Sequence, residues 1–403
     1  MITPTKIPLA RTGARLAVLG GLVAGSLLLA GCSSSSTAGS TAAAADGTAP
    51  VSNGSAQIAV TLTGSDCTTD YTSAPAGPVT FTVTNTDAAG LSEVELLSDK
   101  RIIGERENIV AGLQPATFTV TLSGGTYTLN CPGATTENTS FTVVGAAATT
   151  ASDTASLLAE GTTGYGAYVE DQAQALVTAT QALDAAIQSG DVAAAQKAYA
   201  DARPFYERIE PVAESFADLD PEIDARVADV DPGTDWTGFH PIEKDLFETQ
   251  AITDSTKALS TKLVTDVTQL QTLTTGLTYK PEELANGASG LLDEVQSSKI
   301  TGEEEAYSHI DLLDFAANVE GSEQAFEYLK PGLTTIDPDL TQQISDQFAA
   351  VDALLATYKD TSAVGGYALY TDALKASDAT KLTQAIQALQ APLSQISEKV
   401  ATA

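Results

Sequence analysis

The spacing of apolar residues changes once along this chain of 403 residues, and that change limits its fold more than any other feature. From about Gln57 to Val144, Val, Thr and Phe alternate with period two, as side chains do on half-buried strands. From about Leu157 to Val400, apolar residues recur at i, i+3, i+4 and i+7, which indicates helices. The sequence therefore predicts two domains, an N-terminal all-β sandwich and a C-terminal all-α helical bundle.

Individual elements can be placed from the same patterns. The predicted strands are 57–62, 79–84, 117–122, 126–131 and 140–144. The helical period is clearest in 192–200, 262–270 and 344–358. Prolines divide the helical region and are expected to mark helix starts or ends. They are Pro204, Pro211, Pro221, Pro232, Pro281 and Pro331.

The first 31 residues have the pattern of a bacterial export signal. Three basic residues precede an apolar run, 16–30, that is short for a membrane-spanning helix. The run ends in Leu29-Ala-Gly-Cys32, which is similar to a lipobox, where lipoproteins are cut before a cysteine that is then acylated. A chance cysteine after an ordinary signal is the alternative. We therefore expect an extracytoplasmic protein, periplasmic or at the cell surface, that is anchored to the cell membrane through a lipid on Cys32.

Two segments of low complexity separate the predicted parts. Residues 32–55 consist largely of Ser, Ala, Thr and Gly, cannot form a core, and are predicted to be a flexible tether. A β domain is expected at 56–145. A second Ala- and Thr-rich linker is expected at 146–156, and the helical domain at 157–403.

The charge balance excludes one class of partner. The chain has 20 basic and 52 acidic residues, a net charge of −32. Nucleic acid is excluded, because binding to phosphates needs a basic surface. A strongly negative surface raises the local concentration of metal cations, although such charge more often serves solubility alone.

A histidine and a glutamate three residues apart form the first candidate metal motif. His240 is one of two histidines in the chain, and Glu243 follows it after Pro241, which suits the first turn of a helix. Residues i and i+3 share a helix face, so the imidazole and the carboxylate can meet on one cation. Such a pair suits iron, zinc or manganese. An ordinary helix start with a nearby Glu is the alternative.

Acidic residues form a second pattern upstream. Glu207, Glu210 and Glu214 would share one stripe of a continuous helix, but Pro211 predicts a kink or a new turn between them. A bound cation would relieve the repulsion of three like charges. A stripe of acids exposed to water is the commoner reason for such a pattern.

The second histidine lies in another acidic segment. In a helix, Asp311, Asp314 and Asn318 would share a stripe, while His309 would lie off it and close to Glu320. Metal sites in helix bundles use ligand groups from more than one helix. A structural role for His309 is the alternative.

The two cysteines of the β domain have two possible fates. Cys67 and Cys131 in an exported domain are expected to form a disulfide. Alternatively, their thiolates bind a soft or borderline metal together with strand glutamates. A blue-copper site needs two histidines, and this domain has none. The glutamates concerned are Glu93, Glu95, Glu105 and Glu107, for which solvated strand faces are the simpler interpretation.

Several sequence blocks, in this order along the chain, together resemble the EfeO family, the extracytoplasmic component of the Efe iron-uptake system. They are Glu105-Arg-Glu-Asn-Ile109, Tyr206-Glu-Arg-Ile-Glu-Pro211, Asp218-Leu-Asp220 with Ile223-Asp-Ala-Arg226, Thr237-Gly-Phe-His-x-x-Glu-Lys244, Lys299-Ile-x-Gly-Glu-Glu304 and the long block from Tyr307 to Ser322. The resemblance extends from Gln57 to nearly the end of the chain. Cys32 departs from the family, whose members often carry an ordinary cleaved signal, and so does Pro241, where the family often has Arg.

The resemblance implies a cupredoxin-like β domain joined to an imelysin-like helical domain. It implies capture of iron, ferrous or ferric, for a membrane iron permease, with a haem peroxidase as companion. Copper or zinc are the alternatives at the β-domain site. The implied helical-domain ligands are His240, Glu243, Glu207 and Glu210, then Asp224, His309 and Asp311; those of the β domain are Cys67, Glu93, Glu95 and Cys131.

Two other functions compete with iron capture. Imelysin-like domains are also classed with metallopeptidases, but a zinc peptidase wants two histidines, and the sequence contains no H-E-x-x-H. A copper carrier would need histidine or thioether ligands in the β domain, and the only Met is the initiator. We therefore expect a binding protein and no enzyme.

Overall fold

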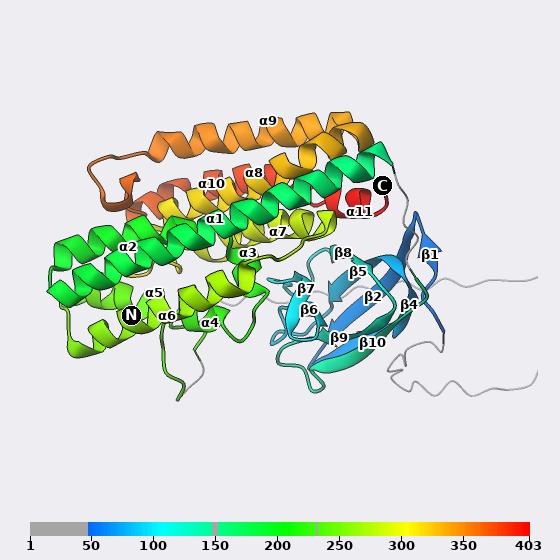
Figure 1. The fold of residues 1–403 in the computed structure, drawn as a ribbon, viewed down its shortest axis with the longest axis horizontal. Coiled ribbons are helices and arrows are strands. Elements are labelled where there is room, and N and C mark those ends of the chain that lie inside the picture. The colour runs from blue at the N-terminus through cyan, green and yellow to red at the C-terminus, as the bar shows by residue number, and fades with distance from the viewer. Residues whose placement is uncertain (1–46, 147–151, 231–232) are drawn as a thin grey trace, which may run out of the picture. The chain divides into compact units, whose positions relative to one another are not determined.

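A computed structural model describes residues 47–146, 152–230 and 233–403. Ala42–Ala403 form one compact unit in which a sheet-rich region is followed by a helical region, as the sequence predicts (Figure 1). The export signal, Cys32 and most of the expected tether lie outside the described residues. Among the described helices, none combines the length and the apolar character needed to cross a membrane.

Two five-stranded sheets make up the β region. The first contains β1 (Val51–Ser52), β2 (Ser55–Thr63), β5 (Gly77–Asn85) and β8 (Ala116–Leu122), with β3 (Asp66–Thr69) paired to β2. The second has the order β4 (Ser73–Pro75), β10 (Asn138–Val144), β9 (Gly125–Asn130), β6 (Val94–Ser98) and β7 (Arg101–Arg106). The five predicted strands are confirmed as β2, β5, β8, β9 and β10.

The alternation of the sequence has its cause in the core between these strands. On β2, Ile58, Val60 and Leu62 are buried, while the residues between them are more exposed. Phe81 of β5 stacks on Phe118 of β8 with ring centroids 4.9 Å apart, and both rings are fully buried. One apolar face per strand therefore fills a single core, as in a sandwich.

The structure differs from the predicted boundaries at both ends of this region. β1 lies inside the expected tether, where Ala49 is buried and its N–H donates to the carbonyl of Ser73. β6 and β7 are not among the five predicted strands, because acidic residues interrupt their apolar alternation, although the glutamates in and beside them were interpreted as lying on strand faces. At the other end, α1 begins at Asp153, within the expected linker.

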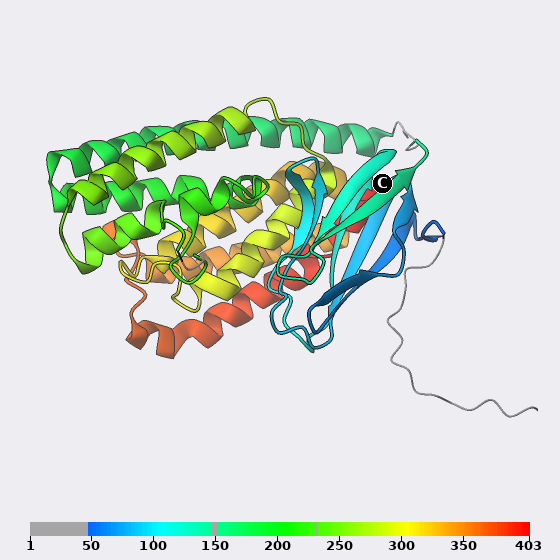
Figure 2. The same ribbon diagram turned by 90° about the horizontal axis from the view of Figure 1, so that it is seen from below.

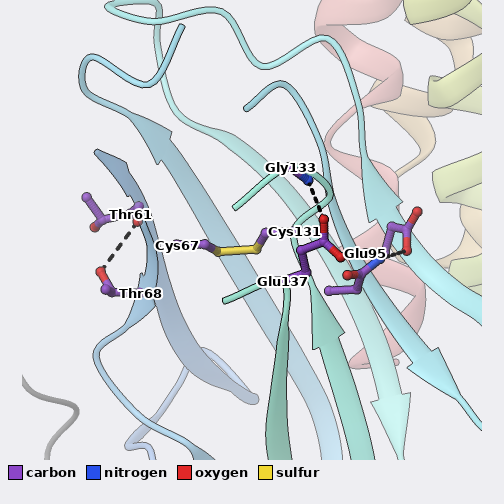
Figure 3. The surroundings of a disulfide bond; sticks show 8 residues. Thr61, Cys67, Thr68, Glu95, Cys131, Gly133 and Glu137 are labelled. Atoms are coloured by element: carbon purple, nitrogen blue, oxygen red, sulfur yellow. Dashed lines mark hydrogen bonds between the residues drawn. A yellow bond between two sulfur atoms is a disulfide. The ribbon is translucent and has the colours of Figure 1, made fainter. Parts of the chain in front are cut away.

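A disulfide joins Cys67 of β3 to Cys131, which follows β9, and so links the two sheets (Figure 3). The expectation of a disulfide is thereby confirmed. The alternative, in which the two thiolates bind a metal, is wrong for this structure, because the sulfur atoms are bonded to each other.

The helical region contains long and short helices (Figures 1 and 2). The long helices are α1 (Asp153–Ser189), α2 (Val192–Glu207), α6 (Asp254–Thr274), α7 (Pro281–Glu294), α8 (Asp311–Ile336), α9 (Pro338–Leu355) and α10 (Asp372–Leu393). The short ones are α3 (Glu210–Glu214), α4 (Asp220–Asp224), α5 (Phe239–Glu243) and α11 (Ile396–Ala401), with the π-helices η1 (Lys244–Glu248) and η2 (Val295–Lys299) and the 3₁₀ turns η3 (Ala356–Tyr358) and η4 (Val364–Gly366). α1 packs against α2, α6 and α8.

Prolines follow the expected rule only in part. Pro211, Pro221 and Pro281 lie in the first turns of α3, α4 and α7, as predicted. Pro204 and Pro331 lie inside α2 and α8, so tertiary packing there overrides the local preference. Pro232 lies outside the described residues.

Candidate metal centre

The position of His240 depends on a tight turn before α5. Gly238 has φ +92°, and a Cβ atom at this residue would lie 2.1 Å from the carbonyl oxygen of Ile223. Only glycine fits there. Pro241 then occupies the first turn of α5, as predicted, and the side chain of His240 is 2% exposed.

The two ring nitrogens of His240 have different surroundings. Nδ1 lies 3.3 Å from Oε2 of Glu243, whereas the buried Nε2 has no hydrogen-bond partner among the described residues. Nε2 is 3.5 Å from Oδ1 of Asp224 and 3.6 Å from Oε1 of Glu304. Donors bound tetrahedrally at 2.0–2.1 Å lie about 3.4 Å apart, which is close to these two distances. All three donor atoms lie within 4.8 Å of one another, and the two oxygens also pair with Arg203.

Glu243 lies behind the imidazole, on the side away from that position. Its Oε1 accepts hydrogen bonds of 2.7 Å from the backbone N–H groups of Tyr307 and Ser308, and its Oε2 faces Nδ1 of His240. Carboxylates in this place orient a metal-binding histidine. The structure thus gives Glu243 a supporting position, where the sequence predicted a shared cation.

A second group of donors adjoins the first. Glu207, Glu210, Asp224 and Glu304 each place one oxygen within 4.8 Å of the others. Glu207 ends α2 and Glu210 begins α3, so the chain kinks between them, as Pro211 suggested. Glu214, at the other end of α3, is not part of the group.

In the segment around the second histidine, some of the predicted residues lie near the donors and others do not. His309 is exposed, has φ +60° and is in neither group of donors. Asp311 and Asp314 are buried, and Oδ1 of Asp311 accepts from the backbone N–H of Glu305. The amide of Asn318 donates to the Glu207 carbonyl and to Oε2 of Glu210.

More acidic than basic groups are buried here. We call the acidic groups the buried carboxylate cluster: Glu207, Glu210, Asp224, Glu243, Glu304, Glu305, Asp311 and Asp314. The cationic groups among them are Arg203, Lys299 and, when protonated, His240. Arg203 forms ion pairs with Glu207, Asp224, Glu304, Glu305 and Asp314. Eight acids against three bases leave the cluster short of positive charge.

Shifted pKa values follow from this shortage. Burial raises the pKa of Asp224 and of Asp311 to about 7, and it raises the pKa values of Glu210, Glu305 and Asp314 well above the ordinary range. The raised pKa values favour the protonated form of these carboxyl groups, and a metal ion that binds to them would compete with those protons.

Two groups at the centre, Glu304 of the cluster and the neighbouring His240, have pKa values that favour the charged form. Burial opposes the ionised form of Glu304, but Lys299, His240 and Arg203 outweigh it and lower the pKa of that carboxyl. Burial also opposes the imidazolium of His240, yet Asp224, Glu243 and Glu304 outweigh it and raise its pKa to about 10. In the metal-free protein His240 is thus protonated at neutral pH, and metal binding has to remove that proton.

A third group of donors lies in the β region. Glu93, Glu105 and Glu107 place oxygens within 4.8 Å of one another. Burial, followed by the neighbouring acids, raises the pKa of Glu93 to about 10 and that of Glu107 to about 8. Glu95 instead accepts a hydrogen bond of 2.7 Å from Asn130 (Figure 3). We call Glu93, Glu105 and Glu107 the β-domain glutamates.

One cavity of about 420 Å³ is lined both by members of the second group of donors and by the β-domain glutamates. The carboxylates that line this acidic cavity are Glu93, Glu95, Glu105, Glu107, Glu210, Glu214, Asp220, Asp224, Asp229, Glu294 and Glu304. Among the described lining residues, the only basic one is Arg226. The cavity therefore extends from the β-domain glutamates to two of the donors around His240, Asp224 and Glu304.

Sequence reasoning missed three residues of this centre. Glu304 was not singled out as a ligand, although the run of three glutamates from 303 to 305 is a signal of its kind. Arg203 and Lys299 carry no local pattern that predicts full burial among acids. Their partners lie mostly about 90 to 110 residues away along the chain.

Comparison with known proteins gives two findings. Residues 161–396 match the family model of imelysin, classed as peptidase M75. The chain is also 38% identical, over 347 residues, to proteins named "Iron uptake system component EfeO" from Escherichia coli K12 and Shigella flexneri. These matches cover 84% of this chain and 90% of each relative.

Proposed function

Because the chain belongs to the EfeO family of iron uptake components, whose helical domain is an imelysin domain, we propose that it captures iron outside the cytoplasm. It delivers that iron to a membrane iron permease of the Efe system, beside a haem peroxidase. The relatives' name supports a place in iron uptake. The binding step and its partners are our proposal.

One observation carries the proposal: the unpartnered Nε2 of His240, buried and facing Asp224 and Glu304 at 3.5 and 3.6 Å. One imidazole with several carboxylates is a borderline-to-hard donor set that suits iron. The excess of acids in the buried carboxylate cluster supports a cation there, since a divalent or trivalent ion would replace the protons that these acids hold.

A zinc peptidase is less well supported by the same geometry. Catalytic zinc sites usually have two or three nitrogen or sulfur ligands and keep one position for water. Among the described residues, His240 is the only histidine in the groups of candidate donors. All other donors are carboxylates, which favours binding of iron over activation of water.

The β-domain glutamates support a second cation site. They offer only oxygen donors, and the sulfur atoms of Cys67 and Cys131 are bonded to each other in the disulfide. Oxygen donors disfavour copper and suit iron. We propose that cations enter through the acidic cavity, because a cavity lined by one sign of charge concentrates the opposite ion.

The lipid anchor remains a proposal that rests on Leu29-Ala-Gly-Cys32. Cys32→Ala should shift the protein from the membrane fraction to the soluble fraction of the producing cell. Unchanged membrane association would contradict acylation at Cys32.

Calorimetric titration tests the proposed iron site. The chain without residues 1–31 is titrated with Fe²⁺ under argon and with Fe³⁺ as a soluble chelate, in parallel with Glu304→Gln. Glu304→Gln keeps the side-chain volume but removes a charged donor, so iron affinity should fall at least about tenfold. Equal affinity in both proteins would remove this centre from the proposal.

A further inference from the structure

The ammonium group of Lys299 lies among the same carboxylates that make up the candidate metal centre. Lys299 ends the π-helix η2, and its side chain is fully buried. π-helical turns are frequent at functional sites. The nearest oxygens to its Nζ are Oε2 of Glu207 at 3.3 Å, Oε1 of Glu210 at 3.3 Å, Oε1 of Glu304 at 3.4 Å and Oε1 of Glu294 at 3.5 Å.

These four distances are long and nearly equal. A hydrogen bond from an ammonium to a carboxylate normally measures about 2.7–2.9 Å. The oxygen of Glu207 nearest to Nζ also lacks a partner with hydrogen-bond geometry. The ammonium donates long hydrogen bonds to Glu210 and Glu294 and lies 3.3 and 3.4 Å from oxygens of Glu207 and Glu304, so no single carboxylate of this oxygen cage holds it by a short bond.

Three members of this cage are also candidate metal ligands, since Glu207, Glu210 and Glu304 belong to the second group of donors. We propose that Lys299 is a tethered competitor of the metal: its ammonium holds these carboxylates in the metal-free protein and leaves them when iron binds. This inference rests on the proposed iron site and adds the element that sets how tightly, and how reversibly, iron is held.

Charge and geometry both favour displacement over sharing. An ammonium and a metal ion would use the same oxygen lone pairs, and their positive charges repel strongly at a separation of a few ångströms. The long stem of lysine can rotate away, whereas the planar guanidinium of Arg203 is fixed by five carboxylates. Glu294, which lines the acidic cavity, can retain the displaced ammonium.

The test removes the competitor and measures metal affinity. Lys299→Met keeps the apolar stem without the charge. Lys262→Met is the matched control, because it removes the same charge from a partly exposed lysine that pairs with Glu222 and Asp266. Mn²⁺, which does not oxidise during titration, is the probe.

Lys299→Met should bind Mn²⁺ at least about tenfold more tightly than the parent protein, and Lys262→Met within about twofold of it. Equal or weaker binding by Lys299→Met overturns the proposal, and so does an equal gain in the control. If the parent protein binds no Mn²⁺ or iron, the proposed function itself fails, which is a separate result read from the parent alone.

A measurement on the unaltered chain keeps the test decisive if Lys299→Met fails to fold. Reductive methylation with isotope-coded formaldehyde, mapped by mass spectrometry, reports the access of each lysine amine. Labelling of Lys299 should rise by severalfold when Mn²⁺ is bound, because its amine then turns toward the acidic cavity, while labelling of Lys262 stays constant. Unchanged labelling of Lys299 contradicts its displacement.

Discussion

At the scale of single residues, the carboxylates around His240 have two different roles, which depend on the ring nitrogen that each of them faces. Asp224 and Glu304 face the free Nε2, while Glu243 contacts Nδ1 and is itself held by two backbone N–H groups. Loss of a ligand removes a bond to the metal, whereas loss of an orienting group weakens binding indirectly.

Graded losses of affinity are therefore expected. His240→Ala should weaken iron binding at least 100-fold, and Glu243→Gln by about 10- to 100-fold, the range for residues that orient a ligand. Calorimetry with iron measures both, with circular dichroism as the check on folding. A folded Glu243→Gln protein that loses as much affinity as His240→Ala would make Glu243 a direct ligand.

The other histidine supplies the control. His309 is exposed and has φ +60°, a conformation that Asn tolerates better than most residues. His309→Asn should therefore leave both fold and iron affinity unchanged within about twofold. A large loss would place the site nearer His309 than the structure does.

At the scale of elements, the short helix α5 is positioned by the turn at Gly238. Gly238→Ala would bring a Cβ atom into the carbonyl of Ile223 and force a positive φ on a residue with a side chain. We expect a lower melting temperature and weaker iron binding, since His240 lies two residues on. Gly233→Ala, at a positive φ with no atom of the described residues near its Cβ, is the control and should have milder effects on both melting temperature and iron binding. Equal effects of the two changes would contradict a specific role for the turn.

The disulfide makes a separate prediction about the β region. It closes a loop of 64 residues, for which the chain-entropy relation gives about 4 kcal/mol of stabilisation. Replacing both Cys67 and Cys131 by Ser should lower the free energy of unfolding by about that amount in chemical denaturation. Iron affinity should stay the same if the sulfur atoms are structural, and a clear loss of affinity in folded protein would restore them as ligands.

The elements that the sequence predicts are those in which one local pattern extends over the whole length. The period of two located β2, β5, β8, β9 and β10 because each covers a single apolar core. The same pattern did not locate β6 and β7, because acidic residues of these strands line the acidic cavity and interrupt the apolar alternation. The prediction that Pro204 and Pro331 mark helix ends was wrong, because tertiary packing outweighed the local preference of proline.

The candidate site was predictable in the same measure. Spacing within one turn singled out His240 and Glu243 and also the stripe that contains Glu207 and Glu210, and the resemblance to a family added Asp224. Glu304 and Lys299 join the centre through contacts with residues 64 to 92 positions away, and no local pattern encodes such contacts. The division of roles between Asp224 and Glu243 likewise depends on three-dimensional geometry.

At the scale of the whole molecule, the shortage of positive charge predicts how stability depends on pH. Burial raises the pKa values of Asp224 and Asp311 to about 7, so the folded state binds more protons than the unfolded state between about pH 4 and 7. The raised pKa of His240, about 10, extends this difference upward from about pH 6.5. Glu304, with its lowered pKa, acts oppositely only in acid, below about pH 4.5.

The metal-free protein should therefore melt several degrees higher at pH 5.5 than at pH 8. Iron or Mn²⁺ replaces the bound protons, so it should stabilise the protein more at pH 8 and bind more tightly there. Thermal melts at both pH values, with and without Mn²⁺, measure this. A metal-free protein that is more stable at pH 8 would show that these acids are not protonated in the folded state.

Anomalous X-ray scattering at the iron edge, from crystals of the chain without residues 1–31 grown with iron, locates the bound iron directly. We expect a peak within bonding distance of Nε2 of His240 and of oxygens of Asp224 and Glu304, with the ammonium of Lys299 turned away from it. An additional peak at the β-domain glutamates would agree with a second cation site. Iron found only there, with the surroundings of His240 unchanged, would contradict the proposed site at His240.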